Sequence, residues 1–260
     1  MSGDTVLLAR DGAIATVTLN KPERLNALDL AMWRAIAAIF ARLDADEQLR
    51  CVILRGAGDK AFAAGADIAE FATERANVEQ AREYGRVAQS AMDAVARCRH
   101  PVVAMIRGVC VGGGLEMAAV CDLRICAESS RFGVPVKNLG LVMAYGEMKG
   151  LIDLVGRAAA LEIVLEGRIF GAQEAQAKGL VNRVVPDGRV EEETAATAQR
   201  IAAGAPLVAR WHKKFARRLA DPRPLAADEY DESFACFGTE DYRIGYRAFL
   251  AKQKPEFRGR

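Results

Sequence analysis

The chain has 260 residues, 51% of them hydrophobic, and its 36 Lys and Arg residues nearly balance 34 Asp and Glu residues. This length can bury a sizeable core, and the apolar fraction excludes general disorder. The formal net charge of +2 gives the whole chain no strong attraction to nucleic acid or to anionic membranes. No apolar stretch approaches the ~18 residues that span a bilayer.

Six cysteines include no C-x-x-C pair, which indicates neither a zinc site nor a redox motif. We therefore expect reduced thiols in a cytosolic protein. The first residues lack the basic and apolar regions of a secretory signal, which also predicts a cytoplasmic location. The only two histidines, His100 and His212, exclude a His-rich metal site, and we expect no metal.

A hairpin is predicted first, with strands at 5–10 and 13–19 flanking a two-residue turn. Ala15, Val17 and Leu19 alternate with polar residues and define one buried face. Asp29 is a predicted cap for a helix with apolar residues every three or four positions, namely Leu30, Trp33, Ile36, Phe40 and Leu43.

Strands and helices then alternate. We expect a buried strand at 51–55, a helix at 77–98, a strand at 102–106, a short helix opening at 112–114 and a strand at 122–127. Beyond about residue 146 helical patterns dominate, with one strand-like stretch at 181–185 and three helices after it. The pattern indicates an α/β core followed by a helical C-terminal part.

Residues 56–61 match the loose dinucleotide pattern G-x-G-x-x-A. The residues that follow do not read as the helix that a pyrophosphate needs, so we interpret this segment as a turn.

The glycine-rich segment 108–116 has no Lys followed by Ser or Thr, and this excludes a P-loop. Gly112, Gly113 and Gly114 offer bare backbone N–H groups at a helix start, and Glu116 follows within one turn. The alternative is that the glycines only permit close packing and that Glu116 only complements the helix dipole. Both interpretations remain open for this segment alone.

The small-residue loop at 61–68 also follows a strand. Two such loops can place two N–H donors on one carbonyl oxygen, which is an oxyanion hole. Taken alone, such a loop is more often only a tight turn.

Several segments together resemble the signature of the enoyl-CoA hydratase/isomerase (crotonase) family. They are 24–28, 61–68, the stretch from His100-Pro101 to Glu116, Cys121-Asp122, 132–135, 172–181 and 248–252. The resemblance covers roughly residues 13–257 in one order. It implies a crotonase-like spiral of ββα units, the α/β fold shared with ClpP.

The resemblance also implies a core at 1–200 and a helical trimerisation region at 201–260. The protein is then expected to be a homotrimer or a dimer of trimers. Its ligand would be an acyl-CoA thioester, with coenzyme A present as part of the substrate and no permanently bound cofactor.

By position in the family pattern, the N–H groups of Ala66 and Gly113 would hold the thioester oxygen, and Glu116 would be the catalytic carboxylate. Positions that match substrate or CoA contacts are Arg24, Ala27, Leu28, Ala64, Asp67, Ile68, Gly112, Pro135, Val136, Phe249 and Lys252.

One residue departs from the hydratase pattern. The second catalytic glutamate would follow Pro135, but Val136 stands there and cannot transfer a proton. Hydration of a 2-enoyl-CoA is the leading expectation, and Δ3,Δ2 isomerisation or another reaction of the family is the alternative. Nearby polar residues that could substitute are Lys137, Asn138, Tyr145 and Glu147.

A non-catalytic CoA-ester or RNA-binding member is the other class of function. Arg210, Lys213, Lys214, Arg217 and Arg218 share a broad face of a predicted helix, and such runs attract phosphate. A solvated or salt-bridged helix is the preferred interpretation because the whole chain is nearly neutral.

Overall fold

The computed structural model describes residues 4–260. The extreme N-terminus, used above to predict the absence of a secretory signal, includes residues 1–3, which lie outside the described part. A six-stranded sheet has the order β1-β2-β3-β5-β7-β10. Its strands are β1 Val6–Asp11, β2 Ile14–Leu19, β3 Cys51–Gly56, β5 Val102–Ile106, β7 Leu123–Ala127 and β10 Arg183–Val185.

The predicted N-terminal hairpin is present. β1 pairs antiparallel with β2, and every other pair in this sheet is parallel. Ala15, Val17 and Leu19 are fully buried, as their alternation predicted. Strands β3, β5 and β7 are buried along most of their length because helices cover both faces of the sheet.

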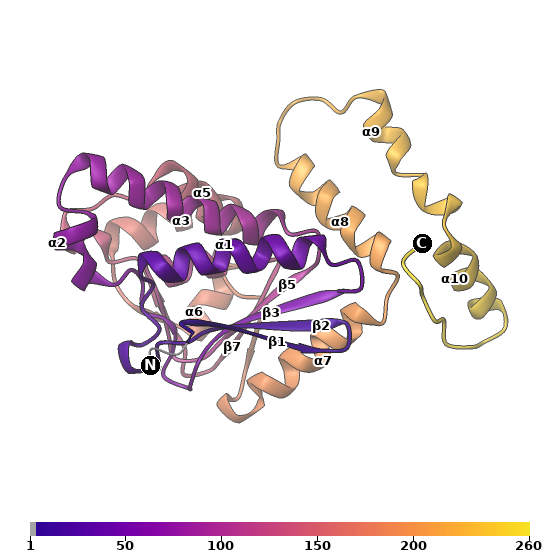
Figure 1. The fold of residues 1–260 in the computed structure, drawn as a ribbon, viewed down its shortest axis with the longest axis horizontal. Helices are drawn as coiled ribbons and strands as arrows, with labels where there is room; N and C mark the ends of the chain where they lie inside the picture. Colours follow the sequence, from indigo (N-terminus) through magenta and orange to yellow (C-terminus); the bar gives the residue numbers. More distant parts are fainter. Residues whose placement is uncertain (1–3) are drawn as a thin grey trace.

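Helices α1 (Leu30–Ala45) and α3 (Val78–Arg97) pack side by side over one face of the sheet (Figure 1). Asp29 caps α1 by accepting a hydrogen bond from the Met32 N–H at 2.7 Å, and Asn77 caps α3 through the Gln80 N–H at 2.9 Å. Helix α7 (Val190–Ala202) covers the opposite face through a separate apolar cluster on β3, β5 and β7.

The structure also contains a second sheet, which the sequence pattern did not predict. It has the order β4-β6-β8-β9, formed by Ala61–Ala63, Val109–Val111, Arg131–Gly133 and Phe170–Gly171. These strands have two or three residues each, too few to show a periodic pattern. Three successive units, β3-β4-α3, β5-β6-α4 and β7-β8-α5, each give one strand to each sheet and then a helix. This confirms the predicted spiral of ββα units.

The remaining helices of the core are short or interrupted. They are α2 Phe71–Glu74, α4 Gly113–Ala119, α5 Tyr145–Glu166 and α6 Ala172–Ala177, and α5 is broken at Gly156, where φ is +77°. Single 3-10 turns occur at Pro22–Arg24, Ile68–Glu70, Val136–Leu139, Asp187–Arg189 and Ala235–Gly238.

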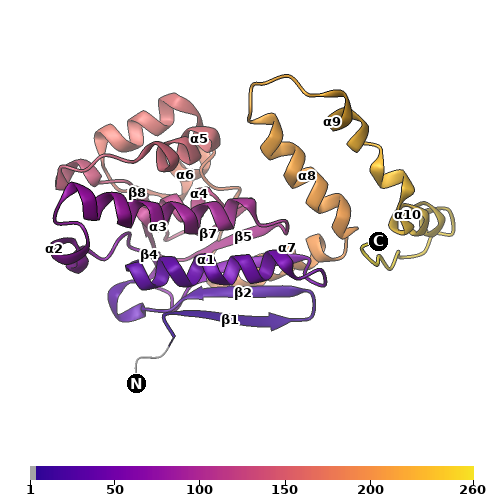
Figure 2. The same cartoon turned by 45° about the horizontal axis from the view of Figure 1, so that its top comes forward.

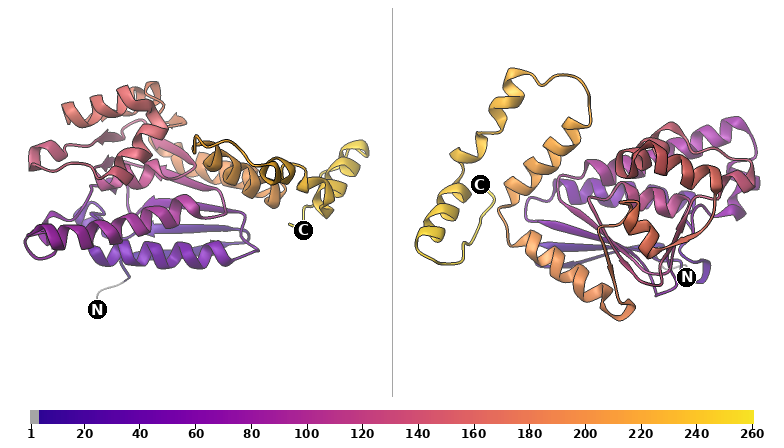
Figure 3. Two further views of the ribbon diagram at one scale, coloured as in Figure 1. Left: turned by 90° about the horizontal axis from the view of Figure 1, so that it is seen from above. Right: turned by 180° about the vertical axis from the view of Figure 1, so that it is seen from behind.

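The last helices form an arm. After β10 the chain has four α-helices rather than the three predicted: α7, then α8 Pro206–Leu219, α9 Ala227–Glu232 and α10 Glu240–Leu250. Helices α8 to α10 extend away from the sheets and end at the C-terminus (Figures 1 and 2). The views from above and from behind show the same separation (Figure 3). Within residues 4–260, no helix has the length and apolarity required to span a membrane.

Candidate active site

A pocket of about 150 Å³ opens between the second sheet and helices α1 and α3. Its wall comes from the loop before the 3-10 turn at Ile68–Glu70, the start of α4, the buried faces of α1 and α3, and the segment from β8 to α5. Of the predicted site residues, this wall includes Ala64, Ala66, Ile68, Gly112, Gly113, Glu116, Pro135 and Val136. One pocket therefore collects residues from segments about 70 positions apart in the chain.

Two backbone N–H groups lie free in this pocket. Within residues 4–260, neither the Ala66 nor the Gly113 N–H has a hydrogen-bond partner. A methyl group added at the Gly113 Cα would lie 3.6 Å from the Ala66 nitrogen and 3.8 Å from Glu116 Oε2. Two unsatisfied donors and a carboxylate thus surround one small volume, an arrangement suited to a substrate oxygen that gains charge.

The approach of α4 to β4 requires glycine. Any side chain on Gly114 would collide with the Ala63 carbonyl oxygen, since a Cβ would lie only 2.2 Å from it. Gly112 adopts φ +52° and ψ −125°, a conformation that other residues avoid. The close-packing interpretation therefore holds for Gly114, and the same packing brings the N–H of Gly113 to the Ala66 loop.

The loop that carries Ala66 is held by a bridge to Leu28. The Leu28 N–H donates to the Gly65 oxygen at 2.7 Å, and the Asp67 N–H donates to the Leu28 oxygen at 2.9 Å. The same Leu28 oxygen accepts from the Tyr84 hydroxyl at 3.2 Å, and that hydroxyl accepts from the Trp33 indole N–H at 3.0 Å. Leu28 therefore acts through its backbone, and its fully buried side chain does not line the pocket.

Glu116 is the carboxylate nearest to the two free donors. Its side chain has no hydrogen-bond partner within the described chain, and the residue is 8% exposed. Burial, followed by the nearby Glu147 carboxylate, raises the pKa of Glu116 to about 8, while Arg75 acts in the opposite direction. Glu116 is therefore largely protonated at neutral pH.

Arg24, Ala27 and Asp67 lie beside the pocket and do not line it. Asp67 is nearly buried, caps the turn at Ile68–Glu70, and pairs with Arg24 at 3.1 Å and with Lys21 at 3.3 Å. The Arg24 side chain remains about half exposed. These residues position the loop that presents Ala66.

Phe249 and Lys252 are not brought to the pocket within this chain. Phe249 lies on α10 and is 83% exposed. Helix α10 and helix α2, which contributes to the pocket wall, lie at opposite ends of the molecule (Figure 1). Lys252 follows in an exposed turn with φ +52°. Within residues 4–260 neither side chain lines the pocket, and their contact with CoA stays a prediction.

The segment after Val136 contributes one polar side chain. Tyr145 is 98% exposed, and neither Lys137 nor Asn138 lines the pocket. Glu147 does line it, together with Val136. Its position in the first turn of α5 depends on the path of the chain from β8, which sequence spacing does not reveal.

One charged pocket residue, Arg75, was not singled out from the sequence. Arg75 stacks over the rings of Phe71 and Tyr84, with its guanidinium carbon 4.6 and 4.8 Å from their centroids. It forms no ion pair with any other described residue. An arginine after a short helix carries no local signal for this placement.

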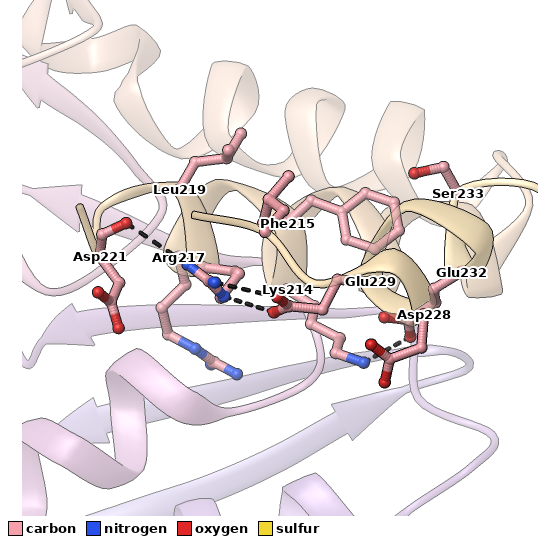
Figure 4. Close-up of a pocket in the computed structure, with 11 residues that line it drawn as sticks. Lys214, Phe215, Arg217, Leu219, Asp221, Asp228, Glu229, Glu232 and Ser233 are labelled. Atoms are coloured by element: carbon pink, nitrogen blue, oxygen red, sulfur yellow. Dashed lines mark hydrogen bonds and ion pairs between the residues drawn. The ribbon is translucent and has the colours of Figure 1, made fainter. Parts of the chain in front are cut away.

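A larger hollow, of about 810 Å³, lies between α8 and α9 (Figure 4). Two ion pairs cross it: Arg218 pairs with Glu229, and Lys214 with Glu232. None of the described residues that line it is buried, so its size alone does not make it the reactive site.

The basic run on α8 is also engaged within the chain. Lys213 pairs with Asp122 at 2.7 Å, and Arg210 donates to the Glu47 and Leu49 oxygens. With Lys214 and Arg218 paired as described above, this surface is a salt-bridged helix, the interpretation preferred from the sequence.

Comparison with known proteins agrees with this geometry. The enoyl-CoA hydratase/isomerase family model matches residues 9–260. A probable enoyl-CoA hydratase of Rhizobium meliloti is 35% identical over 262 residues, covering 100% of both chains, and a short-chain-enoyl-CoA hydratase of Clostridium acetobutylicum is 33% identical, covering 98% of each. A crystal structure of an enoyl-CoA hydratase/carnithine racemase from Magnetospirillum magneticum superposes with a TM-score of 0.98 at 56% identity, covering 100% of this chain and 97% of that one. The chain belongs to the enoyl-CoA hydratase/isomerase family.

Proposed function

We propose that the protein hydrates a 2-enoyl-CoA thioester in the pocket between the Ala66 loop and α4. The observation that carries this proposal is the pair of unsatisfied N–H groups beside the buried Glu116. The Ala66 and Gly113 N–H groups bind the thioester oxygen, which polarises the conjugated double bond and makes the β-carbon electrophilic. Addition of water then gives an enolate whose charge rests on the same oxygen, and one such donor contributes ~10²–10³ in rate.

Glu116 moves the proton in this reaction. Its raised pKa keeps it protonated near pH 7, so it can deliver a proton to the α-carbon as the enolate collapses. Proton transfer by a positioned group typically contributes ~10²–10⁴. The apolar wall formed by Trp33, Ile68, Leu139 and Val142 surrounds the acyl chain and limits competing water.

The CoA portion leaves the pocket along the loop at 24–28 and 64–68. Arg24 is exposed enough to meet a phosphate there, while the fixed backbone of Ala64 and Ile68 borders the thioester. Coenzyme A enters as part of the substrate, and the proposed chemistry requires no permanently bound cofactor. A cytoplasmic location stays a prediction.

We also propose a homotrimer or a dimer of trimers built through the C-terminal arm. Phe234, Phe237, Phe249 and Leu250 expose large apolar side chains on the arm, a feature typical of an interaction surface. Such an assembly gives Phe249 and Lys252 a route to the CoA of a neighbouring copy. Light scattering on the purified protein tests the assembly directly, and a monomer would contradict it.

The reaction is tested by product analysis with two substrates, crotonyl-CoA and 3-butenoyl-CoA. We expect crotonyl-CoA to yield 3-hydroxybutyryl-CoA, and Glu116→Gln to lower this rate ~10²–10⁴-fold. Glu128→Gln, an exposed control, is expected to leave it unchanged. Conversion of 3-butenoyl-CoA to crotonyl-CoA without hydration would instead establish an isomerase. Turnover of neither substrate would favour a protein that only binds CoA esters.

A further inference from the structure

The pocket contains a second carboxylate that the reaction described above does not use. Glu147 lines the same wall as Glu116 and Val136, although it lies eleven positions beyond Val136 in the chain. Hydration requires two proton movements, since a water molecule loses a proton as its oxygen attacks the β-carbon and the α-carbon gains one. Val136 can perform neither step.

The start of α5 fixes the Glu147 side chain. Glu147 Oε2 accepts a hydrogen bond from the Ala144 N–H at 2.6 Å, which closes the first turn of the helix. Its other oxygen, Oε1, has no hydrogen-bond or ion-pair partner among residues 4–260. The carboxylate is therefore oriented by one oxygen and available to a ligand through the other.

The electrostatic interaction between Glu147 and Glu116 supports the placement of Glu147 close to the reactive groups. Among charged neighbours, the Glu147 carboxylate has the largest effect on the pKa of Glu116 and raises it. Two carboxyl groups that interact in this way divide acid and base roles, because the proton held by one favours the ionised form of the other.

We propose that Glu147 is the second catalytic carboxylate of this site, and that it accepts the proton of the water that adds to the β-carbon while Glu116 protonates the α-carbon. This inference rests on the hydratase function proposed above. The water oxygen forms the new C–O bond, and its proton passes to Glu147 Oε1. The π electrons move to the thioester oxygen between Ala66 and Gly113. The enolate then forms a C–H bond with the proton of Glu116, and a proton transfer from Glu147 to Glu116, direct or through water, restores both groups.

The decisive variant is Glu147→Gln. Glutamine keeps an acceptor for the Ala144 N–H and thus preserves the start of α5, but it cannot take a proton. Glu229→Gln is the control, because Glu229 caps α9 from the same helix position through the Ala226 N–H at 2.8 Å, outside the pocket. Glu229 also pairs with Arg218, so the unfolding midpoint of this control is expected to fall while its hydration rate stays at the wild-type value. Thermal unfolding of both variants reports whether the helix starts are intact.

We expect Glu147→Gln to lower kcat for crotonyl-CoA hydration ~10²–10⁴-fold, with the unfolding midpoint unchanged. The ionisation of Glu116 in the pH profile is expected to move to lower pH, because the variant lacks the carboxylate that raises the pKa of Glu116. Exchange of the α-protons of butyryl-CoA in D₂O needs only Glu116, so Glu147→Gln is expected to retain it and Glu116→Gln to lose it.

The outcomes separate this inference from the proposed function. Wild-type protein that does not hydrate crotonyl-CoA contradicts the function itself. Active wild-type protein with a Glu147→Gln variant as active as Glu229→Gln overturns the role of Glu147 alone. Loss of α-proton exchange together with hydration in Glu147→Gln overturns the division of roles between the two carboxyl groups.

Discussion

The contact between α4 and β4 makes a quantitative prediction for Gly114→Ala. The added methyl carbon would lie 2.2 Å from the Ala63 carbonyl oxygen and 2.9 Å from its carbonyl carbon. An ordinary non-bonded contact requires more than 3 Å, so α4 and β4 must separate by about 1 Å. Both partners are backbone or directly attached atoms, and no flexible side chain can absorb the movement.

Separation of α4 from β4 also moves the reactive groups on α4 away from those on the opposing loop. Gly113 and Glu116 lie on α4, whereas the Ala66 N–H belongs to the opposing loop. A 1 Å misplacement of catalytic groups costs about 100-fold in rate, and overpacking costs about 1–3 kcal/mol in the free energy of unfolding. We therefore expect Gly114→Ala to fold with a midpoint a few degrees lower and to lose most of its hydratase activity.

The assay is crotonyl-CoA hydration followed by the loss of enoyl-thioester absorbance, beside thermal unfolding. Gly150→Ala is the control, since a methyl there would lie 3.6 Å from Val120 Cγ1 at the end of α4, an ordinary contact distance. A Gly114→Ala variant with the wild-type rate and midpoint would show that α4 does not depend on this approach, and the positioning argument would be refuted.

Three further variants test other parts of the account. Arg75→Gln removes a cation that lowers the pKa of Glu116, so the limb of the kcat/KM pH profile assigned to Glu116 is expected to move upward; a downward shift would contradict this. Burial, then neighbouring arginines, lower the pKa of His100 from 6.5 to about 4, so the native state favours the neutral ring and loses stability as pH falls from 6.5 towards 4. We expect His100→Phe to remove up to about 3 kcal/mol of this pH dependence in denaturant titrations, whereas equal slopes would oppose the idea. Asn26 is fully buried and bonds the Lys21 N–H and the Ala57 and Ala61 oxygens, so Asn26→Ala is expected to cost at least about 2 kcal/mol by the same measurement.

The elements with strong local signals were predictable. Asp29 and Asn77 cap helices that begin one residue later, and Ala15, Val17 and Leu19 occupy the buried face of their strand. In each case the determining interactions lie within one or two turns or along one strand, so sequence spacing suffices.

The elements fixed by distant contacts were not predictable in the same way. Each of the strands β4, β6, β8 and β9 is too short for a pattern, and they exist because the ββα units stack. The place of Glu116 followed from its motif, but those of Arg75 and Glu147 depend on how α2 and α5 meet the pocket. For Phe249 and Lys252 the motif match predicts a contact with CoA, but within residues 4–260 neither residue lines the pocket.

A crystal structure with acetoacetyl-CoA bound tests the central claim most directly, because it locates the thioester oxygen. The account predicts that oxygen at about 2.7–3.1 Å from both the Ala66 and Gly113 nitrogens, with the α- and β-carbons facing Glu116 and Glu147. A thioester oxygen turned away from these two nitrogens, or a ligand seated between α8 and α9, would contradict it.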